Sequence, residues 1–202
     1  MDTIELQKSL HGLLGNKVKY NGVFTSDLLP ANLEKGERNE AQIFIVNTLS
    51  SKDKITKMGH WVVFYVEKTP INRIVFFDSY GVAPSLYGGN FVDFVNKHKR
   101  KFIFCNWKRS IQPLNSVKCG LYVIYFVHMV SHYGIESTLE KSLKIFSVKN
   151  KGRNDSFVTS YFFRKLNRMK TGNICSYWRS YHSKEIRAIS FKECSKELYT
   201  GN

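Results

Sequence analysis

The most apolar stretch of the chain runs from Leu121 to Val130, and only His128 interrupts its apolar residues. A helix that is apolar on nearly every face belongs in the middle of a core, and this run is too short to span a bilayer. Asn115 and Ser116 are good N-cap residues, and a cap at Ser116 would place Cys119 in the first helical turn. The pattern therefore predicts a central buried helix with a cysteine at its N-terminal end.

A cysteine in that position has distinctive chemistry. The unpaired N–H groups of a first turn and the positive end of the helix dipole favour the thiolate, which is the nucleophilic form. Gly120 would let another segment approach closely. Gln112, seven residues before Cys119, could aim its amide NH2 at the position where an oxyanion develops during attack on a carbonyl. The alternative interpretation is an inert core cysteine.

Two β-prone apolar runs, 60–66 and 73–78, flank a turn-rich segment that contains Pro70. If they form an antiparallel hairpin centred near residue 69, His60 lies opposite Asp78. An aspartate there would fix the tautomer of the imidazole, and the imidazole could take a proton from a thiol. The alternative is a structural hydrogen bond between two strand ends.

The remaining pattern predicts an α+β fold in which the helix of Cys119 packs on a mixed, mainly antiparallel sheet. A basic turn from Lys149 to Asp155 is the best candidate for a hinge between lobes. The other predicted elements are helices at 2–14, 91–99, 135–145 (capped by Ser137), 156–169 and 175–182, strands at 41–49 and 102–107, an irregular segment at 18–30, and loops at 50–59 and 80–90.

Length and composition bound the class of protein. The 202 residues suffice for one domain over 1–202, which could have two lobes with a cleft between them. With 43% hydrophobic residues, the chain is not expected to be disordered. We expect an intracellular protein without a signal peptide or a membrane span. Its cysteines show no zinc or disulfide spacing, so no metal is expected; they are Cys105, Cys119, Cys175 and Cys194.

The net charge of +15 changes the picture, because such an excess attracts polyanions, and nucleic acid most of all. Basic residues cluster after the helix predicted at 91–99, with Phe102, Phe104 and Trp107 between them. This cluster is the first candidate for a DNA contact, although a solvated helix end is the commoner reason for such a run. Its members are Lys97, Lys99, Arg100, Lys101, Lys108 and Arg109.

Several of these residues together resemble the adenovirus maturation proteases, the adenain family, in the cysteine-protease clan that also holds the SUMO proteases. Relatives that process SUMO usually place the glutamine six residues before the cysteine and an Asp directly before it. In this chain the glutamine lies seven residues before the cysteine, and Lys118 stands directly before it, which favours the viral branch. The matching segments are 45–48 ahead of Gly59-His60-Trp61, Phe77-Asp78-Ser79-Tyr80-Gly81, Gln112 through Asn115-Ser116 to Cys119-Gly120-Leu121-Tyr122, and, near the C-terminus, 177–180, 186–187 and 190–191.

The resemblance implies a role for each residue. Cys119 would be the nucleophile, His60 the general base and acid, and Asp78 the orienting carboxylate, a position where adenoviral enzymes often carry Glu. Gln112 and the Cys119 backbone N–H would form the oxyanion hole. It also implies DNA as an activating cofactor and a disulfide between Cys105 and a short activating viral peptide, although 14 residues from Cys105 to Cys119 is shorter than the family pattern.

The sequence therefore predicts a monomeric viral cysteine endopeptidase that matures capsid and core precursor proteins. It would work in the nucleus or a virus factory and be packaged in the virion. Two alternatives stay open. One is a protease of ubiquitin-like modifiers such as SUMO, and the other is a non-catalytic basic protein that binds nucleic acid.

Overall fold

The computed structural model describes residues 1–31, 33, 41–53, 57–68 and 71–168. The helix predicted at 175–182, Cys175, Cys194 and the C-terminal segments of the resemblance lie outside the described residues. The elements are α1 (Thr3–Leu10), β1 (Val18–Thr25), η1 (Ser26–Leu28), β2 (Ala41–Asn47), β3 (Trp61–Glu67), β4 (Arg73–Phe77), η2 (Pro84–Tyr87), α2 (Gly89–His98), β5 (Ile103–Asn106), α3 (Cys119–Tyr133), α4 (Ile135–Ile145) and α5 (Lys151–Arg168).

The strands form one five-stranded sheet in the order β1-β2-β3-β4-β5. β3 pairs antiparallel with β2 and β4, whereas the outer pairs β1–β2 and β4–β5 are parallel. The prediction of an α+β fold with a mixed sheet is confirmed, but the sheet is not mainly antiparallel. β1 lies where an irregular segment was predicted. Its register shifts between Tyr20 and Val23, at Gly22 with a φ of 115°, which breaks the alternation by which a strand is identified.

The predicted hairpin of β3 and β4 forms, but its register differs. Val63 pairs with Phe77 and Glu67 with Arg73, so the hairpin is centred on residue 70 and not on residue 69. Continued past the strand ends, this register would place His60 opposite Tyr80. Side chains alternate between the two faces of a strand, and a shift of two positions in the partner therefore leaves His60 and Asp78 on the same face.

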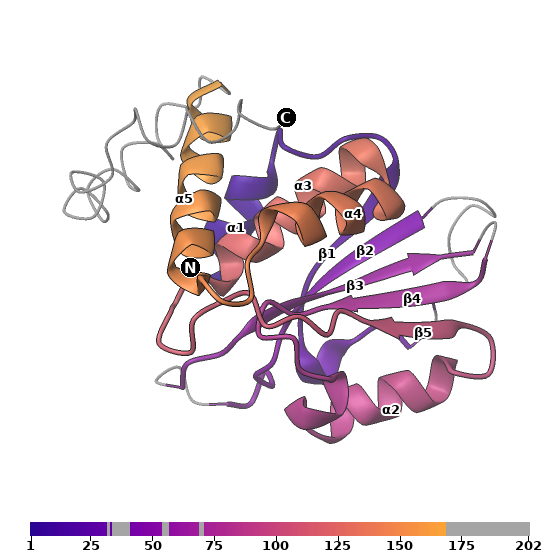
Figure 1. Cartoon of the computed structure of the whole chain (residues 1–202). Coiled ribbons are helices and arrows are strands. Elements are labelled where there is room, and N and C mark those ends of the chain that lie inside the picture. Colours follow the sequence, from indigo (N-terminus) through magenta and orange to yellow (C-terminus); the bar gives the residue numbers. More distant parts are fainter. Residues whose placement is uncertain (32, 34–40, 54–56, 69–70, 169–202) are drawn as a thin grey trace.

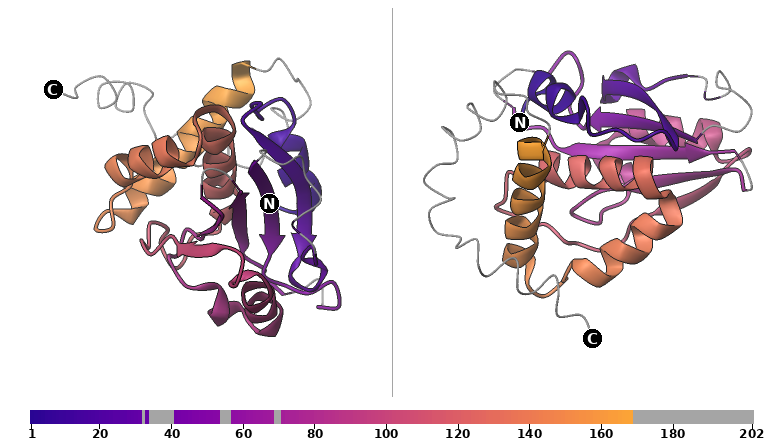
Figure 2. Two further views of the ribbon diagram at one scale, coloured as in Figure 1. Left: turned by 90° about the vertical axis from the view of Figure 1, so that its right-hand side faces the viewer. Right: turned by 90° about the horizontal axis from the view of Figure 1, so that it is seen from above.

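Helices cover both faces of the sheet (Figures 1 and 2). One apolar cluster joins α1, α3 and α5 to one face, and a second joins α2 to the other. Every residue of α3 from Cys119 to Ser131 is buried, as its sequence predicted, and Phe126 stacks on Phe77 of β4 with ring centroids 4.2 Å apart. Within the described part of the chain, no helix has the length and apolar character needed to cross a membrane.

Three predicted helix starts are corrected. α3 begins at Cys119 after Lys118, and the Ser116 hydroxyl does not cap the helix but accepts the Lys118 N–H in the preceding loop. α4 follows Gly134, so Ser137 lies within the helix. α5 begins at Lys151, where Asn150 accepts the N–H of Arg153. The segment predicted as a hinge is therefore largely the first turns of a helix.

We expect Phe126→Ala to lower the free energy of unfolding by about 3–5 kcal/mol, because it leaves a cavity between α3 and β4. Phe126→Leu keeps most of the volume and should cost less than about 1.5 kcal/mol. Urea denaturation followed by circular dichroism measures both. Leu143→Ala, at a side chain that is 48% exposed, is the control and should change the stability by less than about 0.5 kcal/mol. Equal losses for Phe126→Ala and Leu143→Ala would contradict this account of the core.

Candidate active site

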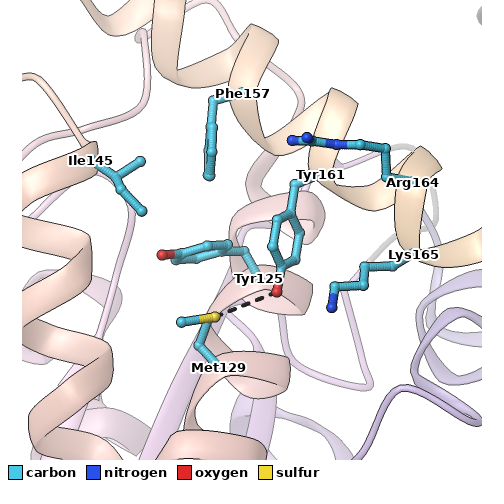
Figure 3. Close-up of a pocket in the computed structure, with 7 residues that line it drawn as sticks. All are labelled: Tyr125, Met129, Ile145, Phe157, Tyr161, Arg164 and Lys165. Carbon is cyan, nitrogen blue, oxygen red and sulfur yellow. Dashed lines mark hydrogen bonds between the residues drawn. The ribbon is translucent and has the colours of Figure 1, made fainter. Parts of the chain in front are cut away.

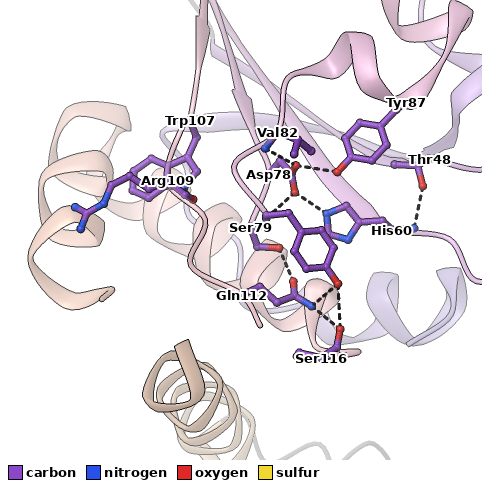
Figure 4. Close-up of polar contacts among 11 residues, drawn as sticks. Thr48, His60, Asp78, Ser79, Val82, Tyr87, Trp107, Arg109, Gln112 and Ser116 are labelled. Atoms are coloured by element: carbon purple, nitrogen blue, oxygen red, sulfur yellow. Dashed lines mark hydrogen bonds and ion pairs between the residues drawn. The ribbon is translucent and has the colours of Figure 1, made fainter. Parts of the chain in front are cut away.

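Four segments that are distant in the sequence meet at one end of the neighbouring strands β3 and β4. Figure 4 shows three of their side chains, His60, Asp78 and Gln112. His60 directly precedes β3, Asp78 directly follows β4, Cys119 begins α3, and Gln112 lies in the loop before α3. The structure therefore brings together all four residues that the sequence singled out. His60 and Cys119 keep 9% of their surface exposed, whereas Asp78 and Gln112 have none. The two groups proposed to react can be reached by solvent, and the two supporting groups are buried.

The carboxylate of Asp78 accepts four hydrogen bonds. Oδ1 accepts from His60 Nε2 at 2.6 Å and from the Tyr80 N–H at 2.9 Å. Oδ2 accepts from the Tyr87 hydroxyl at 2.8 Å and from the Val82 N–H at 3.1 Å. A buried charge is tolerated only when its lone pairs are satisfied in this way. Asp78 is thus a fixed negative group directed at the imidazole.

The segment that carries His60 is tied to the end of β2. The His60 N–H donates to the Thr48 hydroxyl, and the Thr48 N–H donates to the His60 carbonyl, both at 2.9 Å. Gly59 lies so close to Asn47 that a Cβ atom would come within 2.1 Å of the Asn47 Oδ1. These contacts give a physical reason for the Asn47-Thr48 and Gly59-His60 pairs of the sequence. The imidazole is further held by Tyr80, whose ring stacks on it at 4.5 Å between centroids.

The electrostatics favour an ion pair between His60 and Cys119. Burial alone would lower the pKa of His60, but hydrogen bonds to Asp78 and Cys119, and their negative charges, raise it to about 9. Burial alone would raise the pKa of the Cys119 thiol, but the hydrogen bond and charge of His60 and the backbone N–H groups of Trp61 and Gly120 lower it. Because Nε2 of His60 is bound to Asp78, Nδ1 is the nitrogen left for the sulfur. The arrangement can hold a thiolate beside an imidazolium.

The Gln112 amide is held at both ends. Its Oε1 accepts from the Ser79 hydroxyl at 2.6 Å, and its Nε2 donates to the Ser116 carbonyl at 2.8 Å. A second, longer contact of 3.3 Å joins Nε2 to the Tyr80 hydroxyl. The N–H directed at Tyr80 has the weaker partner, so it is the one that a developing oxyanion could take over. The backbone N–H of Cys119, at the first position of α3, is the other candidate donor.

Gly120 permits the close approach that the sequence suggested. A Cβ atom there would come within 2.6 Å of the sulfur of Met1. The Met1 carbonyl in turn accepts the indole N–H of Trp61 at 3.0 Å. Met1 therefore contacts the residue that follows each member of the His60 and Cys119 pair, so the segment before α1 lies beside the site.

The basic cluster has a mixed outcome. Lys97, Lys99, Arg100, Lys101 and Lys108 are exposed. The Arg109 guanidinium instead donates to the carbonyls of Leu143 and Phe146 at the end of α4, which gives it a role in the fold.

The aromatic residues of this cluster are not arranged for stacking on bases. Phe102 and Trp107 are buried, and Phe104 is half-buried. The prediction of aromatics interleaved with surface charges is therefore wrong for Phe102 and Trp107, which belong to the core. Cys105 is a free, exposed cysteine on the edge strand β5.

An apolar pocket of about 290 Å³ lies elsewhere, between α3, the end of α4 and α5 (Figure 3). None of His60, Asp78, Gln112 and Cys119 lines it, so the pocket is not the site of the proposed chemistry. Its lining residues are Tyr125, Met129, Ile145, Phe157, Tyr161, Arg164 and Lys165. Among the described residues, no group of three or more His, Cys, Asp or Glu side chains is placed to hold a metal ion.

The sequence reasoning missed the residues that support the site. Thr48, Ser79, Tyr80 and Tyr87 each contact a predicted site residue. Thr48, Ser79 and Tyr80 belong to segments that resemble the adenain family, but such a resemblance does not show which side chains are in contact. Only the fold brings the loop of Gln112 against Ser79.

We expect His60→Ala to slow the alkylation of Cys119 by iodoacetamide at pH 7 about tenfold or more. Loss of the imidazolium raises the pKa of the thiol, and each unit of pKa changes the thiolate fraction about tenfold. Peptide mass spectrometry after timed alkylation measures the rate at each cysteine separately. The exposed Cys105 is the internal control and should react equally in both proteins. A Cys119 rate that does not change would rule out the ion pair.

Comparisons with known proteins bear on the fold alone. No family model matches the chain, and no curated protein matches it significantly. Among solved structures, the chain is similar to the central domain of the uncharacterized Lpg1148 protein from Legionella pneumophila, with a TM-score of 0.50 and 16% sequence identity. The match covers 84% of this chain and 96% of that domain. At this identity the chain shares an α+β architecture with that domain.

Proposed function

We propose that this chain is a cysteine endopeptidase of the adenain-like type. The observation that carries the proposal is the His60 imidazole between the buried carboxylate of Asp78 and the sulfur of Cys119 at the start of a buried helix. The same constellation serves nucleophilic catalysis on unrelated folds, because a base, its orienting group and a nucleophile must be in line. The segments that resemble the adenain family supply the identification of the branch.

In the proposed acylation step, the Cys119 thiolate attacks the carbonyl carbon of the scissile peptide bond. The negative charge moves to the carbonyl oxygen, where the Cys119 N–H and the Gln112 amide can stabilise it. The intermediate collapses as the C–N bond breaks, and the His60 imidazolium gives its proton to the leaving amine. A thioester on Cys119 and a neutral imidazole remain.

In the proposed deacylation step, neutral His60 takes a proton from water, and the hydroxide attacks the thioester carbon. The second tetrahedral intermediate expels the Cys119 thiolate and releases a carboxylic acid. Asp78 stabilises the imidazolium each time it forms, because its ionised carboxylate accepts a hydrogen bond from the Nε2–H group. No metal or small-molecule cofactor is needed for either step.

The proposed substrates are viral capsid and core precursor proteins, cut next to small residues. This part rests on the resemblance, since narrow clefts in this clan favour Gly-Gly and Gly-x sequences. The enzyme would act in the nucleus or a virus factory as a monomer, and it would be packaged in the virion.

DNA and an activating peptide are proposed as partners. The charge of +15 and the exposed lysines at the end of α2 support DNA binding. Cys105 is exposed on β5, a strand at the edge of the sheet. A peptide could pair with such an edge and form a disulfide with Cys105. The exposure of Cys105 is the observation in favour of this second proposal.

We expect the protein to hydrolyse Gly-Gly and Leu-x-Gly peptides or capsid precursors, and Cys119→Ala to abolish this activity by about ten-thousandfold or more. The pH profile should be bell-shaped. Activity appears as pH rises through the lowered pKa of Cys119 and is lost as pH passes about 9, where His60 loses its proton. A matched assay uses a SUMO fusion. Cleavage of the fusion alone would favour the deconjugating enzymes, and no cleavage with tight DNA binding would favour the non-catalytic alternative.

We expect the double variant Lys97→Ala/Arg100→Ala to weaken DNA binding and to make the plot of log affinity against log salt shallower by about 0.9 for each lost phosphate contact. Fluorescence anisotropy with a duplex at several salt concentrations measures this slope. Lys141→Ala/Lys144→Ala removes the same charge from α4 and is the matched control. Equal effects of the two double variants would show that only net charge matters, and would contradict a DNA contact at the end of α2.

A further inference from the structure

Ser79 lies between the two supporting groups of the site. It directly follows Asp78 and is 1% exposed, and its hydroxyl is 2.6 Å from the Oε1 of Gln112. Its carbonyl accepts the N–H groups of Ile111 at 2.9 Å and Gln112 at 3.0 Å. Both the backbone and the side chain of Gln112 are thus bound to this one serine (Figure 4).

The partners of the Gln112 amide decide which way it faces. One end of the amide meets the carbonyl of Ser116, which can only accept, so this end must be the NH2 group. The other end is therefore the oxygen. An oxygen cannot donate, and so the Ser79 hydroxyl must donate to it. A hydroxyl is suited to this place because it can turn its proton toward the acceptor.

We propose that Ser79 is a positioning residue that sets the orientation of the Gln112 amide, so that an N–H of this amide faces the oxyanion. The proposal deepens the proposed function and rests on it for the role of the oxyanion. Without the hydroxyl, Oε1 is a buried acceptor that has lost its donor. The amide is then held by its NH2 end alone and can tilt away from the reaction.

The His60 and Cys119 pair does not depend on the Ser79 side chain. The donors to the Asp78 carboxylate are His60, the Tyr80 and Val82 N–H groups and the Tyr87 hydroxyl. A change confined to the Ser79 hydroxyl should therefore leave the thiolate–imidazolium pair intact. This separation allows a positioning role to be distinguished from a general weakening of the site.

The kinetic test compares Ser79→Ala with Ser131→Ala, a buried serine of α3 whose hydroxyl donates to the His128 carbonyl. Removing one oxyanion donor outright costs about 100- to 1000-fold in kcat, so a tilted donor should cost at least about tenfold. We expect Ser79→Ala to lower kcat at least about tenfold with little change in KM. The same variant should weaken the binding of a peptide aldehyde inhibitor by a similar factor. Ser131→Ala should do neither. The pH dependence of Cys119 alkylation should stay as in the wild type.

Two further variants complete the kinetic test. Ser79→Thr keeps the hydroxyl and should retain most of kcat, and adding Ser79→Ala to Gln112→Ala should cause no further loss. Unchanged kcat in Ser79→Ala, an alkylation profile that shifts with kcat, or additive losses in the double variant would overturn the proposal.

A second measurement tests the orientation without any turnover. The chain has three glutamines, Gln7, Gln42 and Gln112, so ¹⁵N-glutamine labelling gives three side-chain NH2 pairs, and Gln112→Ala assigns one of them. The chemical shifts of the Gln112 NH2 pair and its protection from hydrogen exchange should change in Ser79→Ala and remain unchanged in Ser131→Ala. An unchanged pair would overturn the proposal. Absence of hydrolysis and of aldehyde binding in the wild type would instead count against the proposed function, and the NH2 pair would still report on Ser79.

Discussion

The buried carboxylate of Asp78 is the constraint on which the site depends. A charge with no exposed surface must be satisfied by the protein itself, and here two backbone N–H groups, one hydroxyl and one imidazole do so. The backbone must turn sharply after β4 to bring its own N–H groups back to this side chain. Gly81 makes the turn with a φ of 72°. A Cβ atom at Gly81 would come within 2.5 Å of the Arg109 backbone, so the turn also fixes where the next loop runs.

The rest of the site follows from that turn. Ser79 in the turn binds Ile111 and Gln112 through its carbonyl, which brings the loop before α3 against the end of β4. The Asp78 charge raises the pKa of His60, and the resulting imidazolium helps to lower the pKa of Cys119. Cys119 is the first residue of the buried helix α3, where the free N–H groups of the first turn can stabilise its thiolate. Both the His60 and Cys119 pair and the proposed oxyanion donor Gln112 therefore depend on the few residues that follow β4.

The sequence predicted much of this arrangement, because burial and strand pairing act on patterns that can be read directly. The apolar run of α3 and the hairpin of β3 and β4 brought His60, Asp78 and Cys119 together as expected. The hairpin centre was wrong by one residue, and the site survived because the pairing shift was even. β1 was missed because of the irregular register at Gly22. The prediction of Ser116 as a helix cap was wrong, because a serine hydroxyl accepts a backbone N–H both in a helix cap and in a loop turn.

What the sequence could not predict are contacts between loops. Ser79 touches Gln112 across 33 positions, and no local pattern encodes that distance. Likewise, Phe102 and Trp107 look like an exposed aromatic surface between lysines, but they fill the core where β5 joins the sheet. The spacing of charges and aromatics describes one strand at a time, whereas burial depends on which elements cover it.

The most direct test of the account is whether Cys119 carries the acyl group. The protein would be mixed with a peptide ester, quenched in acid within milliseconds and analysed by mass spectrometry, intact and after digestion. The account predicts a transient mass gain equal to the acyl group, located on the peptide that contains Cys119 and absent in Cys119→Ala. Turnover without any acylated protein, or an acyl group found on Cys105 instead, would contradict it.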